Sequence, residues 1–339
     1  MDVACVRVPR ERGEATRRQL ADAGLLDHGH EITHEDGTLY IPVTDAEAAE
    51  SLVDTDGGDD AAVAVEFRDL PARETQQLPD DLLGFEPSYE RLGEVVILDE
   101  EDADRAREIA DAMVASDIPV ETVVNRASKV KGDLRVRDWD VLVGTDTEAV
   151  HREYGCEFLV DIAEVYFSPR LATERHRVVQ QVQSGERAFD MFAGVGPFAV
   201  PMAKRGAEVV GCDLNPVAVE YLRENAERNG VTERVTAVAG DVREVAEDWT
   251  DWADRLVANL PHSADEFLDT AVALAGDDCV LHYYDIQHED DLFGPGERAI
   301  RQAVADAGGE YDVEVLTRHE VRSYAPHEVN VCLDVALSR

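Results

Sequence analysis

Lysine is almost absent from this chain. Only Lys129, Lys131 and Lys204 occur among 32 basic residues, so 29 are arginines (32 − 3), while 73 residues are acidic. The net charge of −41 argues against a polyanionic partner in dilute salt. At 1 M salt, however, the Debye length is about 3 Å, so the summed repulsion is almost fully screened. We interpret the net charge as a sign of adaptation to high salt, so binding partners have to be inferred from the local distribution of charge. The alternative is an acidic protein that does not bind nucleic acid.

Paired cysteines and long apolar runs are lacking as well. The five cysteines are scattered without a CxxC pair, which excludes a zinc-ligand spacing and a disulfide framework. No stretch reaches the roughly 20 apolar residues of a membrane span, and no signal peptide opens the chain. The composition, at 44% hydrophobic, still provides for folded cores. We therefore expect a cytoplasmic protein with no metal site.

Composition and periodicity divide the chain into four segments. Residues 1–68 suit a small α/β domain, and residues 69–90, with three prolines among polar residues, suit a linker. Residues 91–176 predict a mixed α/β middle domain. In residues 177–339, short apolar runs alternate with helical segments, which predicts a mostly parallel, seven-stranded α/β sheet. The last two runs follow each other without a helix, so an antiparallel strand is expected at one edge.

The strongest motif follows the first strand of that sheet. It reads DMFAGVGPF, in which Gly194 and Gly196 permit positive φ angles and a close approach of a ligand to the backbone. Pro197 suits the first turn of the following helix. Asp213 lies 19 residues after Gly194, at the end of the second strand, where a doubly wound fold holds ribose hydroxyls. The motif therefore predicts a cofactor loop.

More than one ligand fits this loop. Its G-x-G-x-x-A spacing matches the dinucleotide fingerprint, so a nicotinamide cofactor is one alternative and a ligand-free turn is another. The string Asp190-x-Phe192-Ala193 before the glycines instead resembles motif I of class I methyltransferases, which bind S-adenosylmethionine. Gly240-Asp241, after the third strand, lies where such enzymes place a polar group near the adenine. We favour S-adenosylmethionine.

The fourth strand ends in Asn259-Leu260-Pro261, at the edge where open α/β sheets bind ligands. This string resembles the Asn-Pro-Pro-aromatic loop of amino-directed methyltransferases, although Leu260 and His262 depart from it. An ordinary strand-to-loop stop is the alternative. Because the string follows a cofactor loop, we favour a role at the target base.

A charged block, FSPRLATERHRV, precedes the cofactor loop. A helix would place its Arg170, Glu174 and Arg177 on one face, where a solvated ion pair is the alternative interpretation. In the order FSPRLATER, DMFAGVGPF and NLP, the three blocks closely resemble the archaeal and eukaryotic tRNA (guanine-N1)-methyltransferases, which modify guanosine 37 beside the anticodon. The resemblance covers most of residues 90–339. Residues 1–68 match only loosely, as a small tRNA-binding domain.

The resemblance implies a role for each matching position. Glu174 is the expected general base. Asn259 is expected to orient the target base, and Pro261 to shape the pocket. Arg135 of the middle domain is expected to contact guanine O6, with Arg137 as the alternative. The cofactor, bound by the domain of residues 177–339, is expected to lie against Arg175, Phe192, Ala193, Gly194, Gly196, Asp213, Leu214, Asp241, Val242 and Asn259.

Local charge supports a tRNA partner. Residues 3–18 carry five arginines against two glutamates, a balance of +3 (5 − 2), and residues 126–137 carry five basic residues against Asp133, a balance of +4 (5 − 1). Solvated basic faces are the alternative. The residues expected at the tRNA are Arg10, Arg17, Arg126, Lys129, Lys131, Arg137, Arg170 and Arg177.

Two other functions stay open. A wybutosine-pathway enzyme that transfers the aminocarboxypropyl group of the same cofactor shares the fold, although the NLP string and the Glu174-Arg175 pair favour methyl transfer. A non-catalytic tRNA-binding protein is the third candidate, and the intact Glu174, Asn259 and Asp213 count against it. We expect a monomer without an obligate protein partner.

Overall fold

The computed structural model describes residues 2–54, 63–73, 76–128, 132 and 137–339. It divides into two compact units, Met1–Gln77 and Leu78–Arg339, which are taken in turn. In the described part of the chain, no helix is long and apolar enough to cross a membrane.

The first unit is a four-stranded antiparallel sheet in the order β2-β3-β1-β4. Its core comprises alternate residues of the strands with Leu20 and Ala49 from the two helices. The elements are β1 (Val3–Pro9), α1 (Gly13–Asp22), β2 (Thr33–Glu35), β3 (Thr38–Pro42), α2 (Ala46–Asp54) and β4 (Ala64–Arg68).

The second unit begins with a mixed sheet in the order β5-β6-β7-β8. Its elements are α3 (Pro79–Leu83), β5 (Tyr89–Leu92), β6 (Val95–Leu98), α4 (Ala103–Ala115), β7 (Thr122–Arg126) and β8 (Trp139–Val143). The sequence suggested a linker over 69–90, yet α3 and the start of β5 lie within it. Pro79 occupies the first turn of α3, where a missing N–H costs nothing, and Gly84 closes that helix at φ +73°.

A hairpin leads from this sheet to the large one. Strands β9 (Glu148–Glu153) and β10 (Cys156–Asp161) pair antiparallel across Tyr154 and Gly155, both of which have positive φ. The Asn225 side chain accepts from the backbone N–H of Leu159 at 2.7 Å, which attaches β10 to a helix of the large sheet.

The large sheet has seven strands in the order β13-β12-β11-β14-β15-β17-β16, which confirms the predicted mostly parallel α/β fold. Strand β17 runs antiparallel to both β15 and β16, so the antiparallel strand lies one place in from the edge. The strands are β11 (Arg187–Asp190), β12 (Glu208–Asp213), β13 (Val235–Ala239), β14 (Ala253–Ala258), β15 (Ala275–His288), β16 (Asp312–Ala325) and β17 (Glu328–Ser338).

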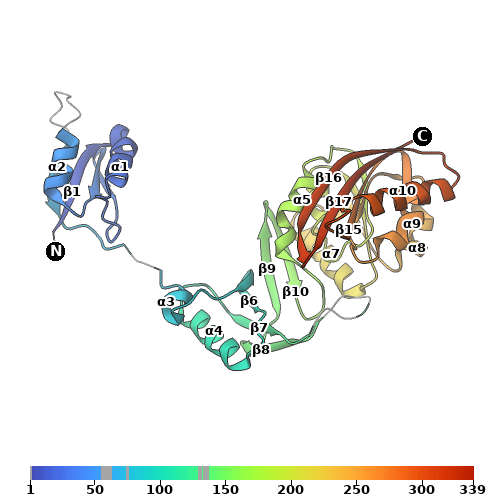
Figure 1. Ribbon diagram of the computed structural model, residues 1–339, viewed down its shortest axis with the longest axis horizontal. Coiled ribbons are helices and arrows are strands. Elements are labelled where there is room, and N and C mark those ends of the chain that lie inside the picture. The colour runs from blue at the N-terminus through green and yellow to red at the C-terminus, as the bar shows by residue number, and fades with distance from the viewer. Residues whose placement is uncertain (1, 55–62, 74–75, 129–131, 133–136) are drawn as a thin grey trace. The chain divides into compact units, whose positions relative to one another are not determined.

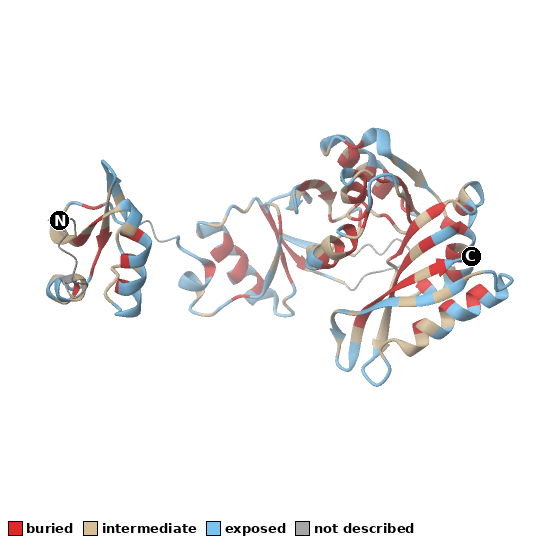
Figure 2. Cartoon of the chain, turned by 90° about the horizontal axis from the view of Figure 1, so that it is seen from above, coloured by how far each residue is buried: buried red, intermediate tan, exposed pale blue. Residues whose placement is uncertain are grey.

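Helices cover both faces of this sheet (Figure 1). The hydrophobic core on one face of the sheet includes residues of α5 (Ala172–Val179), α6 (Ala199–Lys204) and α7 (Pro216–Arg228). The opposite core includes α8 (Val242–Val245), α9 (Leu268–Leu274) and α10 (Gly294–Asp306). Strand β17 is mostly buried, whereas β16 at the edge of the sheet is largely exposed (Figure 2).

Candidate active site

The cofactor loop joins β11 to α6. Gly194 and Gly196 have φ +52° and +91°, in the left-handed region that other residues rarely adopt. A Cβ on Gly196 would lie 2.3 Å from Leu222 Cδ1, whereas one on Gly194 would meet only the Tyr166 carbonyl oxygen, at 3.9 Å. Gly196 therefore serves helix packing, while Gly194 leaves open space above the backbone for a ligand.

Asp213, at the end of β12, is held against this loop. Its carboxylate accepts hydrogen bonds from the backbone N–H groups of Gly194, at 2.7 Å, and Asn215, at 2.9 Å. Burial raises the pKa of Asp213, and these two amides oppose the rise. The spacing of 19 residues thus reflects a direct contact between the cofactor loop and the end of β12.

Asp190 lies beneath the loop, fully buried. Neither of its carboxylate oxygens has a hydrogen-bond partner of good geometry in the described structure. Burial raises the pKa of Asp190 to about 8, and the backbone amides of Phe192 and Ala199 oppose this only in part. A buried carboxyl without a cation marks this end of the sheet as short of positive charge.

The parallel register brings the other predicted cofactor residues to the same edge. Asp213 pairs with Ala239 of β13, so Asp241 and Val242 follow at the start of α8. Leu214, beside Asp213, is 48% exposed, so its side chain is available for an apolar contact with a flat ring of the cofactor. Open backbone at Gly194, an exposed apolar side chain and carboxylates at two strand ends fit the nucleoside and methionine parts of S-adenosylmethionine. Phe192 packs edge-on against Phe267.

Asn259 and Pro261 follow β14 at this edge. Within the described residues, no group hydrogen-bonds to the Asn259 side chain, so its amide is available to a ligand. The Pro261 carbonyl oxygen accepts from the Ile286 N–H at 3.2 Å, which ties the loop to β15. The two residues therefore have the setting that the sequence predicted for them, and their roles stay a prediction.

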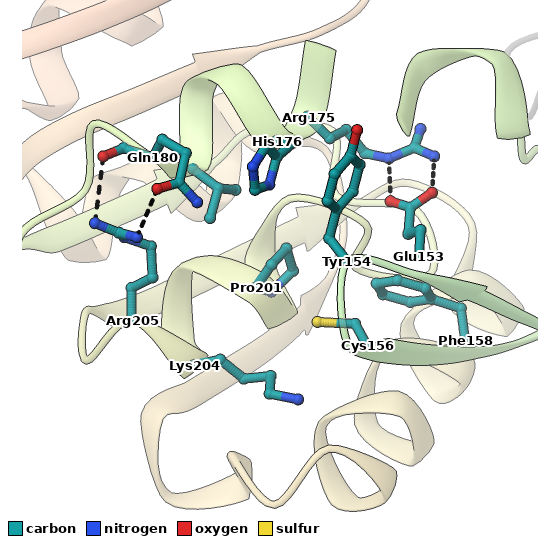
Figure 3. Close-up of a pocket in the computed structure, with 11 residues that line it drawn as sticks. Glu153, Tyr154, Cys156, Phe158, Arg175, His176, Gln180, Pro201, Lys204 and Arg205 are labelled. Atoms are coloured by element: carbon teal, nitrogen blue, oxygen red, sulfur yellow. Dashed lines mark hydrogen bonds and ion pairs between the residues drawn. The ribbon is translucent and has the colours of Figure 1, made fainter. Parts of the chain in front are cut away.

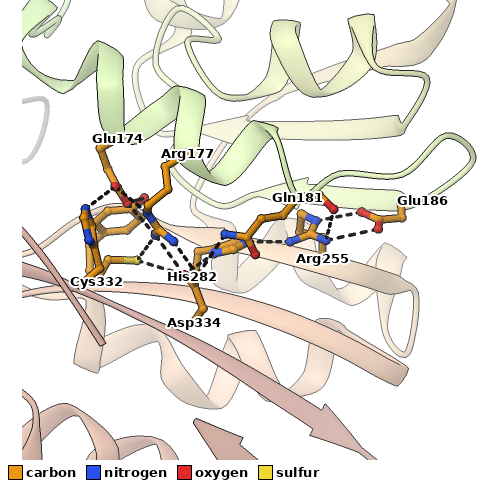
Figure 4. A network of polar contacts seen from close by, with 10 residues as sticks. Glu174, Arg177, Gln181, Glu186, Arg255, His282, Cys332 and Asp334 are labelled. Atoms are coloured by element: carbon orange, nitrogen blue, oxygen red, sulfur yellow. Dashed lines mark hydrogen bonds and ion pairs between the residues drawn. The ribbon is translucent and has the colours of Figure 1, made fainter. Parts of the chain in front are cut away.

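Glu174 lies in the first turn of α5 and is only 5% exposed. Its Oε1 accepts from the Tyr284 hydroxyl at 2.7 Å and from Arg177 Nη2 at 2.8 Å. Its Oε2 accepts from Arg177 Nε at 2.8 Å and lies 3.1 Å from His319 Nε2 (Figure 4). The ion pair with Arg177 is thus buried, not solvated. Arg170 lies in a preceding 3-10 turn, Pro169–Leu171, and does not share the face.

Packing connects this carboxylate to the cofactor loop. The Tyr284 ring lies 6.0 Å from the ring of Phe198, which ends the loop. Tyr284 also follows Tyr283, whose register partner on β14 is Ala258, immediately before Asn259. Tyr284 therefore links the Glu174 carboxylate to the end of the loop after β11, and it lies on the strand next to the one that precedes Asn259.

The sequence analysis did not predict the polar residues behind Glu174. Arg177 Nη1 donates to Asp334 at 2.6 Å, and His282 lies opposite Asp334 in the β15–β17 register. Arg255 Nη1 lies 2.7 Å from His282 Nε2. Because a guanidinium only donates, Nε2 must accept, so the proton on Nδ1 goes to Asp334 at 2.7 Å. The signal available was a polar residue inside each apolar run, LHYY and CLDVAL.

The same residues do not fit a metal ion. His282, Cys332 and Asp334 bring possible ligand atoms within 4.8 Å of one another. However, both guanidinium groups, of Arg177 and Arg255, already contact this cluster. A cation would face two fixed positive charges in a buried site, which is unfavourable.

Arg175 faces away from Glu174, towards the hairpin. Its Nε donates to Glu153 at 2.7 Å, and its Nη1 to the Ser168 carbonyl oxygen at 3.0 Å. Arg175 and Glu153 lie at one end of a pocket of about 140 Å³, with Gln180 and Arg205 at the other (Figure 3). Of the predicted cofactor residues, Arg175 alone lines this pocket, so its cofactor contact stays a prediction.

The predicted tRNA residues have varied surroundings. Arg126 and Arg170 both pair with Glu90, so the local charge counted along the sequence is partly neutralised by a distant carboxylate. Arg137 lies over the Trp139 ring at 5.4 Å and forms no ion pair with a described residue. Lys129, Lys131 and Arg135 lie outside the described residues. In the first unit, Arg10 is exposed and Arg17 pairs with Glu14.

Comparison with known proteins adds three family matches. The model for the TRM5/TYW2 methyltransferase domain matches residues 149–316. The model for the tRNA methyltransferase 5 N-terminal domain matches residues 5–50, and that for the TYW2 N-terminal domain matches residues 74–147.

Individual relatives extend over almost the whole chain. A tRNA (guanine(37)-N(1))-methyltransferase, Trm5b, of Pyrococcus abyssi is 39% identical over 337 residues, which are 98% of each chain. The solved complex of aTrm5 and tRNALeu covers 98% of this chain and 99% of its own at 31% identity, with a TM-score of 0.70. A tRNA(Phe) (4-demethylwyosine(37)-C(7)) aminocarboxypropyltransferase of Pyrococcus horikoshii is 29% identical over 77% of this chain and 93% of its own. This chain belongs to the TRM5/TYW2 methyltransferase family.

Proposed function

We propose that this protein transfers a methyl group to N1 of guanosine 37 in tRNA. The observation that carries the proposal is the buried Glu174 carboxylate, positioned beside the cofactor loop by Arg177 and Tyr284. The similarity to Trm5b, at 39% over 98% of the chain, exceeds that to the aminocarboxypropyltransferase, at 29% over 77%.

The methyl donor is S-adenosylmethionine, which supplies an electrophilic methyl group on its sulfonium sulfur. Gly194 offers an open stretch of backbone for it, and Asp213 offers a carboxylate at the strand end where ribose hydroxyls bind. Leu214, Asp241 and Val242 follow at neighbouring strand ends and suit the adenine.

Glu174 takes the proton from guanine N1, which is a poor nucleophile while protonated. A carboxylate has about four lone-pair positions, and four contacts occupy them here. The contact with His319 is the longest, and the His319 side chain is 38% exposed. The substrate N1–H is therefore expected to replace His319 at Oε2, while Arg177 and Tyr284 keep the carboxylate in place.

The remaining groups position the base and stabilise charge. The free Asn259 amide is suited to hold the edge of the guanine, and Pro261 stiffens the loop. As N1 loses its proton, negative charge builds on O6, where a guanidinium stabilises it. Arg135 was the first candidate for this contact. Arg137 is a strong alternative because it has no carboxylate partner among the described residues and rests on Trp139.

The partner is tRNA, since a close structural relative forms a complex with it. Contacts by the arginines of residues 3–18 and 126–137 are part of the proposal. A cytoplasmic location and a monomeric state without an obligate protein partner stay predictions.

The deciding experiment incubates the full chain with unmodified tRNA and cofactor labelled in the methyl group, in molar potassium chloride. Label recovered in 1-methylguanosine at position 37 is the expected result. A parallel reaction uses cofactor labelled in the carboxypropyl carbons. Incorporation of that label alone indicates aminocarboxypropyl transfer, and incorporation of neither label favours a non-catalytic tRNA-binding protein.

A further inference from the structure

Arg177 lies between two buried carboxylates. Its Nε and Nη2 donate to Glu174, both at 2.8 Å. Its Nη1 and Nη2 donate to Asp334 at 2.6 and 3.1 Å. One guanidinium has five N–H donors in a fixed plane, so it can hold both groups at once. The single positive charge is therefore shared between the expected base and a second anion.

The second anion is fixed independently of the base. Asp334 accepts from Gln181 Nε2 at 3.0 Å and from His282 Nδ1 at 2.7 Å. His282 is locked by Arg255, whose Nε donates to Glu186 at 2.8 Å. Burial acts to raise the pKa of Asp334, but His282, Arg177 and Gln181 together hold it well below its usual range. Asp334 is thus a permanent negative charge in the folded protein.

The groups that face Glu174 come from four elements. Arg177 lies on its own helix, Tyr284 on β15, His319 on β16, and Cys332 and Asp334 on β17. Burial raises the pKa of the Tyr284 hydroxyl and of the Cys332 thiol well above their usual values, so both are neutral. The fixed charges around the base are therefore Arg177 and Asp334.

We propose that Asp334 is a positioning residue for methyl transfer, which shares the Arg177 guanidinium and so prevents that cation from weakening Glu174 as a base. This rests on the proposed function, in which Glu174 accepts the N1 proton. A carboxylate at hydrogen-bond distance from a cation that has no other anionic partner binds a proton more weakly. With the charge divided, Arg177 orients Glu174 while part of its positive charge is directed to Asp334.

The test measures single-turnover methyl transfer to unmodified tRNA as a function of pH, with the full chain in molar potassium chloride. Asp334→Asn keeps the shape but removes the charge, so Glu174 receives all of the Arg177 interaction. The acid limb of the pH–rate profile is expected to move to lower pH by about one unit, since one unit corresponds to tenfold in proton affinity. The plateau rate is expected to fall several-fold because the base is weaker.

Gln181→Leu provides a second variant, which is milder since Gln181 is only half-buried. It removes an uncharged donor from Asp334, so Asp334 draws more on Arg177. The acid limb is then expected to move the other way, to higher pH, by a fraction of a unit. A purely structural defect would slow the reaction, but it would not move the acid limb to lower pH in one variant and to higher pH in the other. Asp254→Asn, which breaks the Arg187 pair elsewhere on β14, is the matched control.

Cofactor affinity and thermal midpoints of all variants confirm folding, and Gln181→Leu decides the question where Asp334→Asn does not fold. Limbs that stay at the wild-type position in the folded variants overturn the positioning role while the proposed function stands. A wild-type chain that transfers no methyl group to the tRNA overturns both.

Discussion

The catalytic domain buries carboxylates on two sides of its candidate site but surrounds them differently. Under the cofactor loop, Asp190 has no cation and no well-formed hydrogen bond, and burial raises its pKa to about 8. Behind α5, Asp334 is about as deeply enclosed, yet three donors hold its pKa far below the usual range. Burial alone therefore does not set the charge of a carboxyl group here; its partners do.

The difference in charge between the two sides matches the role proposed for each. The α5 side holds a complete set of charges, with Arg177 between Glu174 and Asp334, before any substrate arrives. Such preorganised charge acts on a reaction without further rearrangement. The loop side, with Asp190 and Asp213, is short of positive charge at the place where a sulfonium-bearing cofactor is expected.

The largest effect is expected from removing the base on the α5 side. Glu174→Gln keeps the size and a hydrogen-bonding oxygen but cannot take a proton, so turnover is expected to fall by about 10²–10⁴-fold. Cofactor affinity, measured by equilibrium binding, is expected to stay at the wild-type value because the loop side is untouched. Glu208→Gln, an exposed carboxylate at the start of β12, is the control. Near-normal turnover in Glu174→Gln would remove Glu174 as the base.

The next effect concerns stability. Arg177→Met leaves two buried carboxylates without their shared cation, and breaking a buried pair in this way costs about 3–5 kcal/mol. Arg187→Met breaks the half-exposed pair with Asp254, where about 1 kcal/mol or less is expected. Urea unfolding of both variants at pH 7 measures the difference. Equal losses would mean that the Arg177 ion pairs add no more than those of a surface arginine.

The two sides also differ in how far sequence could predict them. The loop side is local: Gly194, Gly196 and Asp213 lie within one strand-helix-strand unit, and their chemistry follows from spacing. Glu174 was predicted through the resemblance of the upstream FSPRLATER block to a known family. Its surroundings were not, because Asp334 lies 157 positions from Arg177 and His282 lies 52 positions from Asp334. The antiparallel register of β15 and β17 brings His282 to Asp334, and the packing of α5 on the sheet brings Arg177 to the same carboxylate.

The apolar runs predicted the strands of this sheet correctly, but they did not show that the polar residues inside two of these strands pair with each other. His282 and Asp334 are register partners on β15 and β17 and are hydrogen-bonded. Likewise, Arg126 and Arg170 looked like free tRNA contacts until Glu90, from β5, was found beside both. Sequence showed which residue types were present, and the fold decided which charges remain unpaired.

A smaller effect tests the loop side through pH. The pKa of Asp190 is raised in the folded state, so the folded protein holds a proton there that the unfolded chain has lost above about pH 4. Its contribution to stability is complete at low pH and declines as pH rises towards about 8. Asp190→Asn is expected to remove this decline, so its advantage in thermal midpoint over wild type grows from pH 5 to pH 8.5.

Asp334 is expected to give the opposite sign. Its pKa is lowered in the folded state, so its contribution is complete at neutral pH and is lost as pH falls below about 4. The deficit in thermal midpoint of Asp334→Asn relative to wild type should therefore shrink as pH falls below about 4. The advantage of Asp190→Asn over wild type, in contrast, is small between pH 4 and pH 5 and grows as pH rises. The same slope in both variants would contradict the assignment of opposite charge states to the two sides.

The smallest effect is expected where a carboxylate is paired but not buried. Glu14, on α1, accepts from Arg17 and Arg18 at 3.0 and 2.9 Å, and these hydrogen bonds lower its pKa to about 2. The group is fully exposed, and at 1 M salt the Debye length is about 3 Å, no longer than the pair itself. Glu14→Ala is therefore expected to leave the thermal midpoint in molar potassium chloride within error of wild type, with a small loss only in dilute salt. A large loss in molar salt would show that partners, even without burial, are enough to make a carboxylate structural, and would weaken the contrast drawn between the two buried sides.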